Sequence, residues 1–299
     1  MKSHLIALFT VGIWGVTFVS TKVLLEDFSP LWILLLRFTV GFIALFALRP
    51  KILKMKRRRD ELLFIAAGAT GIAGYYLLEN IALVFTTATA VGVIVAASPL
   101  FTAVLSALLG DRSAIHPRFF IGFALAMTGL VLVSFNSSTG GTPILDGADL
   151  LGDLLALTAA LIWAIYSLLV RKISDLGYET ISATKRTFLW GLAFIVPSTL
   201  LFGGSLAPIH VIFELQNLLN LVFLGIVASA MCFATWAIAV KRLGATTSTT
   251  YIYLVPAITA IASICILGEP LNVAIVTGAA LTIAGLLISN RKNPPVPKQ

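Results

Sequence analysis

The sequence predicts an all-α integral membrane protein with ten transmembrane helices, arranged as two five-helix repeats of inverted topology. The first observation behind this prediction is composition. Of the 299 residues, 59% are hydrophobic and only 11% are charged, and the mean hydropathy is +1.00. Such values lie far from those of soluble domains. The second observation is the placement of basic residues in alternate loops, and the third is an internal duplication.

Ten apolar segments are long enough to span a bilayer, which takes roughly 20 residues of α-helix. We expect the spans at 4–24, 31–48, 62–84, 88–109, 118–135, 150–170, 187–203, 217–239, 246–267 and 271–289. The second and seventh spans are the shortest, and an earlier start would bring the arginine near each of them inside the helix.

The distribution of Lys and Arg supports this number of spans. Loop 49–61 is the most basic, and the segments 110–118, 171–186, 240–245 and 291–299 also carry Lys or Arg, whereas the alternate loops 25–30, 85–87, 136–149, 204–216 and 268–270 carry none. Basic loops stay on the cytoplasmic side of a membrane. The pattern therefore predicts ten spans in the cytoplasmic (inner) membrane, with both termini in the cytoplasm.

A duplication is visible at a fixed offset between the halves. Ile13-Trp14 returns as Ile162-Trp163, Lys22 as Arg171 and Arg37 as Arg186. Four aligned positions inside equivalent apolar blocks indicate an internal repeat. We expect a first repeat at 1–135, an external linker at 136–149, a second repeat at 150–290 and a cytoplasmic tail at 291–299.

An odd number of helices per repeat has a topological consequence. The first helix runs outward and its copy, the sixth, runs inward, so the halves are related by an axis in the membrane plane. That arrangement recurs in secondary transporters.

The later helices of each half also align. The aligned pairs are Gly68 with Gly225, Ala82 with Ala239, Ala88 with Ala245, Pro99 with Pro256, Gly110-Asp111 with Gly268-Glu269, and Gly122 and Gly129 with Gly278 and Gly285. The glycines of each pair in the last helix are seven residues apart, which places them on one face and permits close helix packing.

Together these positions resemble the EamA-type, ten-helix members of the drug/metabolite transporter superfamily over essentially the whole chain. The features of the resemblance are the Trp of the first helix, the Arg of the second, the mid-helix Pro and the Gly-Glu after the ninth helix. The first half departs from the pattern with Gly110-Asp111, which keeps the glycine and the acidic group. Within the superfamily, the chain is similar to bacterial exporters of aromatic and other amino acids (the YddG type).

The resemblance implies a secondary transporter that exports amino acids, with aromatic and other neutral ones favoured, by alternating access. Transport of another small metabolite or drug, such as a sugar, nucleotide or purine, is the alternative on the same fold. Expected partners are a small-molecule substrate and membrane lipid, with a monomer as the working expectation. Nucleic-acid binding is disfavoured because the basic residues occupy short loops.

Aromatic residues are the main candidates for substrate binding. Trp14 and Trp163 lie near the middle of their spans, too deep for interfacial anchors, and Tyr166 follows Trp163 by one turn. They either pack the interior or line a central cavity.

Glu79 is an acidic residue within the third span, where an isolated carboxylate is expensive. It either snorkels to the outer interface or faces a cavity. Further candidates for the substrate pathway are Tyr75, Trp236, Phe101 and Thr102.

Two other pairs are assigned different roles. For Arg37 and Arg186 we favour a structural role, pairing with carbonyls or a carboxylate, over direct substrate contact. Pro99 and Pro256 each remove a backbone hydrogen bond inside a helix, and such kinks suit gating.

An intramembrane enzyme is the rival from another class. The chain has no His-Glu-x-x-His and no Gly-x-Ser-x-Gly, and its three histidines lie outside the predicted membrane interior. We therefore expect no catalytic residues, no metal and no cofactor.

Overall fold

The computed structural model describes residues 2–111, 117–134, 147–269 and 273–290, and these are helical almost throughout. Most of the expected linker 136–149 and all of the expected tail 291–299 lie outside the described residues. The elements are α1 Lys2–Leu24, α2 Pro30–Leu48, η1 Arg58–Asp60, α3 Glu61–Ala67, η2 Gly68–Gly74, α4 Tyr75–Phe85, α5 Ala88–Val95, α6 Ser98–Leu108, α7 Pro117–Ser134, α8 Gly147–Asp175, α9 Thr180–Phe202, α10 Ile209–Ile212, α11 Leu215–Val222, η3 Phe223–Met231, α12 Cys232–Leu243, α13 Ala245–Thr249, η4 Thr250–Leu254, α14 Val255–Leu267 and α15 Val273–Asn290.

Within the described residues, consecutive elements join into ten long helical rods at the positions of the ten predicted spans, and the short helix α10 lies between the seventh and the eighth. By length and composition alone, seven of the described helices could cross a membrane. The rods α7, α9 and α15 are also long, with 18, 23 and 18 residues. The chain is therefore an all-helical, multi-span membrane protein.

Two rods extend well beyond the apolar segments from which they were predicted. α8 runs from Gly147 to Asp175 and α9 begins at Thr180. An α-helix satisfies its backbone hydrogen bonds in water as well as in lipid, so it need not end where the apolar stretch ends. As a result, Arg186 lies in the second turn of α9.

The packing of the two halves is nearly symmetric. α1 packs against α12 and α14, and its copy α8 packs against α4 and α6. Likewise α2 contacts η3, and its copy α9 contacts η2. The rods α2 and α9 contact each other directly, as do α5 and α14. These reciprocal pairs are those expected of two repeats related by a two-fold axis.

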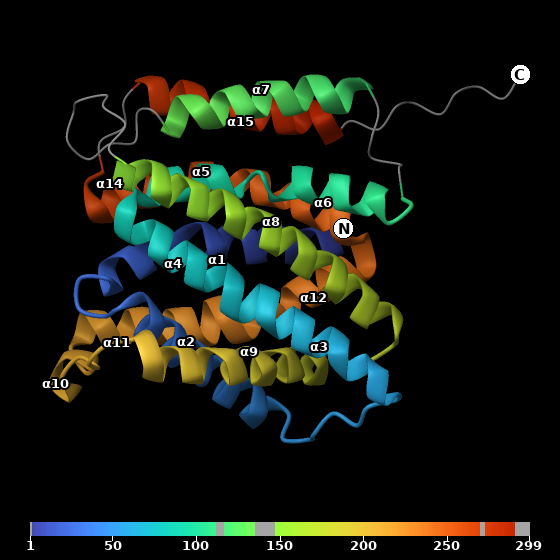
Figure 1. The fold of residues 1–299 in the computed structure, drawn as a ribbon, viewed down its shortest axis with the longest axis vertical. Helices are drawn as coiled ribbons and strands as arrows, with labels where there is room; N and C mark the ends of the chain where they lie inside the picture. The colour runs from blue at the N-terminus through green and yellow to red at the C-terminus, as the bar shows by residue number, and fades with distance from the viewer. Residues whose placement is uncertain (1, 112–116, 135–146, 270–272, 291–299) are drawn as a thin grey trace, which may run out of the picture.

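The last helices of the two halves, α7 and α15, form a separate layer beside the bundle (Figure 1). Glycines allow their close approach, as the sequence predicts. A Cβ atom on Gly129 would lie 2.4 Å from the Gly278 carbonyl oxygen, and one on Gly285 would lie 2.5 Å from the Gly122 carbonyl oxygen. Phe119 and Ala126 of α7 pack towards Leu100 in the neighbouring layer.

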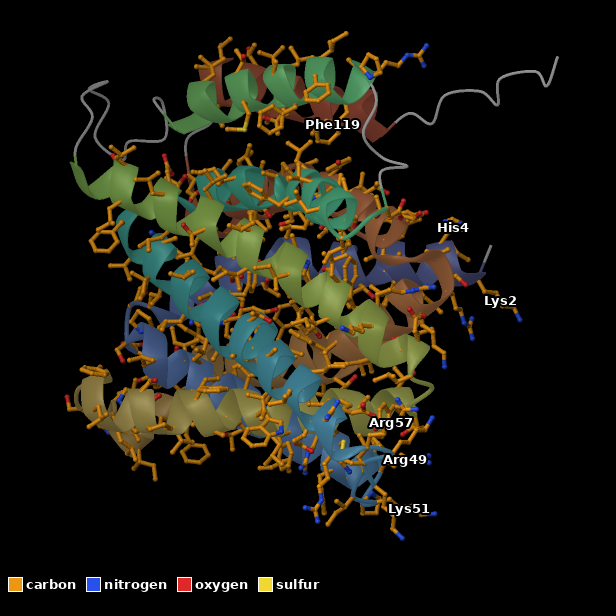
Figure 2. The ribbon with its side chains drawn as sticks, turned by 45° about the vertical axis from the view of Figure 1, so that its right-hand side comes forward. Lys2, His4, Arg49, Lys51, Arg57 and Phe119 are labelled. Atoms are coloured by element: carbon orange, nitrogen blue, oxygen red, sulfur yellow. The ribbon has the colours of Figure 1, made fainter. Side chains whose placement is uncertain are left out.

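Four of the basic residues that the sequence places on one side of the membrane lie together at one end of the bundle. Figure 2 shows Lys2, Arg49, Lys51 and Arg57 at the same end. Glu179 lies at this end too, outside the spanning helices, and forms an ion pair with Arg49 at 3.1 Å. Burial raises the pKa of Glu179, but hydrogen bonds from Ser182 and Ile181 and the charge of Arg49 outweigh burial and lower that pKa.

At the opposite end, two charged side chains hold the turn between α4 and α5. Lys22 of α1 donates hydrogen bonds to the carbonyl oxygens of Leu83 and Thr86. Glu269, after α14, accepts from the backbone N–H groups of Ala88 and Thr89 at 2.9 and 3.2 Å. A carboxylate at a helix N-terminus satisfies free N–H groups and the helix dipole. The acidic residue of the Gly-Glu motif therefore caps a helix of the other half.

Candidate functional site

Three tryptophans from both halves meet in the middle of the bundle. Trp14 of α1 lies 5.1 Å from Trp163 of α8 and 5.1 Å from Trp236 of α12, measured between ring centroids. Trp163 and Trp236 are 5.9 Å apart. Their exposed fractions are 7%, 3% and 0%. The duplication in the sequence thus brings the two copies of the first-helix tryptophan into edge-to-face contact, a favourable aromatic geometry.

Tyrosines and a phenylalanine extend this cluster. Tyr75 and Tyr166 lie 4.8 and 5.0 Å from Trp163. Phe233 lies within 5.9 Å of Trp14 and 5.8 Å of Tyr166. Phe233 is absent from the residues predicted from the sequence, although it precedes Trp236 by three positions and so shares its helix face. We call Trp14, Tyr75, Trp163, Tyr166, Phe233 and Trp236 the aromatic cluster.

The indole N–H groups of the three tryptophans differ in their hydrogen bonding. Trp14 Nε1 donates to the Ala228 carbonyl oxygen at 3.0 Å. The Nε1 atoms of Trp163 and Trp236 are buried and have no hydrogen-bond partner among the described residues. A buried donor without a partner is unfavourable by about 1–3 kcal/mol. Two donors in the cluster are therefore available to a polar ligand.

Charged groups lie beside the aromatic cluster. Arg37 of α2 is completely buried, and its guanidinium carbon lies 4.2 Å from the ring centroid of Tyr76, whose ring is 4.7 Å from that of Tyr75 in the cluster. Its Nε atom donates to Ser229 at 2.7 Å. Glu79 is 1% exposed, and its Oε1 atom has no hydrogen-bond partner among the described residues. Glu79 thus lies buried in the bundle interior and does not reach out to the interface.

The partners of Trp14 and Arg37 belong to a π-helical segment, η3. Its copy in the first half, η2, is also π-helical. The wider π turn is common at functional sites. Here it places the Ala228 carbonyl and the Ser229 hydroxyl towards α1 and α2. The hydropathy pattern gave no signal for either residue, since π and α turns share the same composition.

The two candidates on the fourth predicted helix, Phe101 and Thr102, lie on α6. Thr102 of α6 is buried and donates to the Ser98 carbonyl oxygen of its own helix at 2.9 Å. Phe101 is half-buried and packs on the main core, but no ring contact among the described residues joins it to the aromatic cluster.

Pro99 and Pro256 both lie at the beginning of a helical segment. Pro99 follows the break between α5 and α6, and Pro256 follows the 3-10 stretch η4 that leads into α14. At Pro99 the missing N–H leaves the Val95 carbonyl free, and the Ser98 hydroxyl donates to it at 2.7 Å. The fourth and ninth rods are therefore interrupted at equivalent points.

Arg186, the copy of Arg37, is engaged in a conventional ion pair. Its Nε and Nη2 atoms both lie 2.8 Å from Glu61 Oε1, and the Trp190 indole N–H donates to the same oxygen. No group of His, Cys, Asp or Glu suited to hold a metal ion occurs in the part of the chain that the structure describes.

Comparison of the sequence with protein families gives a match over both halves of the chain. The model of the EamA-like transporter family matches residues 1–135 and 150–291. A solved structure, described only as a protein crystal structure, aligns with a TM-score of 0.68 and 21% identity, covering 96% of each chain. That likeness concerns the fold alone.

Curated relatives match over nearly their full length. A "Probable amino-acid metabolite efflux pump" of Escherichia coli (strain K12) is 30% identical, with 96% of this chain and 94% of the relative covered. A "Probable terminal-alkyne amino-acid exporter" of Streptantibioticus cattleyicolor is 28% identical, with 95% and 91% covered. An "Uncharacterized transporter" of Archaeoglobus fulgidus is also 28% identical, with 97% and 98% covered.

Proposed function

Because the chain belongs to the EamA-like transporter family, we propose that it exports amino acids, aromatic and other neutral ones above all, from the cytoplasm by alternating access. The family and its named relatives make the chain a multi-span membrane transporter and not an enzyme. The names of two relatives, "Probable amino-acid metabolite efflux pump" and "Probable terminal-alkyne amino-acid exporter", support the proposed substrate class. The site supplies an independent reason for the same class.

That reason is the combination of an aromatic cluster with buried charges at the contact between the halves. Indole and phenol rings offer flat apolar surfaces and polar edges, which suit aromatic and aliphatic side chains. Arg37 lies against Tyr76, which contacts Tyr75 of the cluster, and Glu79 interacts with Tyr75 itself. Two indole N–H groups of the cluster have no partner among the described residues. An amino acid combines an apolar side chain with two charged groups, and this site offers complementary chemistry to both parts.

Alternating access is supported by the symmetry and by the interrupted helices. Two similar halves packed around a common site can rock against each other. The breaks before Pro99 and Pro256 supply equivalent points at which the fourth and ninth rods can bend. We assign gating to these two prolines.

Counterflow into proteoliposomes with a panel of labelled amino acids tests the proposed function. We expect exchange of at least one aromatic or branched neutral amino acid, competed by unlabelled substrate, with and without an imposed pH gradient. Empty liposomes supply the background. Exchange of a sugar, nucleotide or purine with no amino-acid exchange would replace the substrate class with the alternative. A pH-gradient effect on the rate would indicate proton coupling.

The orientation in the membrane gives a second expected result. In a background without Cys232 and Cys265, we expect Ser205→Cys to react with an impermeant maleimide in intact cells. Lys54→Cys is its matched control, because both positions are exposed and lie in loops at opposite ends of the bundle. Lys54→Cys should react only after the cells are opened. The reverse pattern of labelling would place the termini outside and contradict an exporter of this orientation.

A further inference from the structure

Arg37 is a buried cation with most of its hydrogen-bonding capacity unused. Its exposed fraction is 0%, and its Nη1 and Nη2 atoms have no partner among the described residues. Its Nε atom donates a hydrogen bond to Ser229, and its guanidinium carbon lies 4.2 and 5.4 Å from the ring centroids of Tyr76 and Phe38. The Tyr76 hydroxyl and the Glu79 carboxyl group also interact with it electrostatically. The Nε bond fixes the plane of the guanidinium and leaves its two terminal NH2 groups without a hydrogen-bond partner among the described residues.

Two free terminal groups of one guanidinium form a fork. The fork matches the two oxygens of a carboxylate, and bidentate pairs of this kind are among the strongest polar contacts in proteins. A guanidinium buried for structural reasons alone is expected to have its donors satisfied. Arg186 meets that expectation, since its guanidinium donates to the Glu61 carboxylate. Both side chains of this pair are also partly exposed. The two copies of one arginine thus differ: among the described residues, Arg186 forms an ion pair with a carboxylate and Arg37 does not.

Glu79 supplies the complementary half of the arrangement. It lies one turn after Tyr75 and Tyr76 on α4, and it interacts electrostatically with Arg37. The described residues contain no ion pair between the two within 4.0 Å. A buried guanidinium and a buried carboxylate therefore lie near each other. The Nη1 and Nη2 atoms of Arg37 and the Oε1 atom of Glu79 have no partner among the described residues, while Tyr75 interacts with the Glu79 carboxyl group.

We infer that Arg37 binds the carboxylate and Glu79 the ammonium of an α-amino acid, whose side chain then faces Trp163 and the rest of the aromatic cluster. This inference rests on the proposed function, and it moves Arg37 from the structural role favoured by the sequence to substrate recognition. A zwitterion placed between the two residues neutralises both charges at once. Each charge would otherwise remain incompletely compensated inside the bundle.

The inference makes Arg37 a specificity-determining residue. The site should discriminate by the head group first and by the side chain second. An α-amino acid should bind well, and its carboxamide, which lacks the carboxylate, should bind poorly. The deamino analogue, which lacks the ammonium, should also bind poorly, but because of Glu79.

The experiment compares these three ligands on the full-length protein in lipid nanodiscs. The twenty proteinogenic amino acids are first ranked by isothermal titration calorimetry, and the tightest one is then measured beside its carboxamide and its deamino analogue. The variants are Arg37→Gln, Arg37→Lys, Glu79→Gln and, as a matched control, Arg186→Gln. Thermal melting and gel filtration report the folded fraction of each variant.

For the unmodified protein, we expect the amino acid to bind roughly 10- to 100-fold more tightly than its carboxamide, in line with hydrogen bonds to charged groups. Arg37→Gln should abolish that preference and leave carboxamide binding within about threefold, and Arg37→Lys should restore part of it. Glu79→Gln should instead weaken the preference for the amino acid over its deamino analogue. Arg186→Gln should lower the melting temperature and keep both preferences.

Three outcomes would overturn the assignment. If the unmodified protein binds an amino acid and its carboxamide equally, Arg37 is no carboxylate ligand, although the proposed function stands. If Arg37→Gln weakens the binding of the amino acid and of its carboxamide by the same factor, Arg37 maintains the structure of the site and does not bind the carboxylate. If no amino acid binds and none is exchanged in proteoliposomes, the proposed function itself fails, and this inference fails with it.

Discussion

Alanine in place of Gly68 is expected to lower the melting temperature of the purified protein by several degrees. Gly68 opens the π-helical segment η2 where this segment crosses α9 of the other half. A Cβ atom there would lie 2.6 Å from the Gly191 backbone nitrogen and 2.9 Å from the Thr187 carbonyl oxygen. These neighbours are backbone atoms, so the two rods must separate to relieve the contact. Overpacking of this kind lowers the free energy of unfolding by about 1–3 kcal/mol.

Gly12→Ala is the matched control for this prediction. Gly12 lies in α1, and a Cβ atom at that position would meet nothing within 4 Å. Alanine favours the helix over glycine by about 1 kcal/mol. The control should therefore melt at the same temperature or higher in the same detergent. Equal melting temperatures for the two variants would show that the crossing of the third and seventh rods is looser than the structure has it.

The fold was accessible from the sequence because the bilayer imposes simple rules. A spanning rod needs about 20 apolar residues, and its loops obey the positive-inside rule. The duplication then predicts the packing as well. Once Trp14 and Trp163 are recognised as copies, a two-fold axis brings them close to each other, and the structure places their rings 5.1 Å apart. The glycines of α7 and α15 were predictable for the same reason.

The polar partners in the site could not be read from the pattern. Arg37 and Arg186 occupy equivalent positions, but among the described residues Arg186 forms an ion pair, with Glu61, and Arg37 forms none. That neighbour comes from the third rod, far along the chain, and no spacing rule connects the two. Likewise, the contacts of Ala228 and Ser229 depend on a π-helical turn. Hydropathy cannot distinguish this turn from an α turn, because the same apolar residues satisfy both.

Helix breaks were predicted at the right residues but with a different geometry. A proline inside a helix was expected to produce a kink at Pro99 and at Pro256. In the structure each proline lies at the first residues of a new segment, after a break that begins a few residues earlier. Proline disfavours the α conformation at the residue before it, so the interruption extends backward along the chain.

Trp163→Ala is expected to raise the apparent KM for aromatic amino acids about 2- to 12-fold more than for a small substrate such as threonine. The ring of Trp163 contacts Tyr75 and Tyr166 and faces the interior of the aromatic cluster. Stacking against an aromatic substrate contributes about 0.5–1.5 kcal/mol beyond area burial, which corresponds to this range of fold-changes. Counterflow in proteoliposomes, normalised to the folded fraction, measures the ratio of the two KM values.

The ratio is the informative quantity because Trp163 is also a packed residue. Its removal leaves a cavity and lowers stability by about 3–5 kcal/mol, which affects all substrates alike. Trp163→Phe keeps an aromatic face without the N–H group and should restore most of the preference. Trp14→Ala is the paired control, since Trp14 donates to the Ala228 carbonyl oxygen and is held by the fold. If Trp163→Ala changes the KM values for phenylalanine and threonine by the same factor, the indole packs the bundle and selects no substrate.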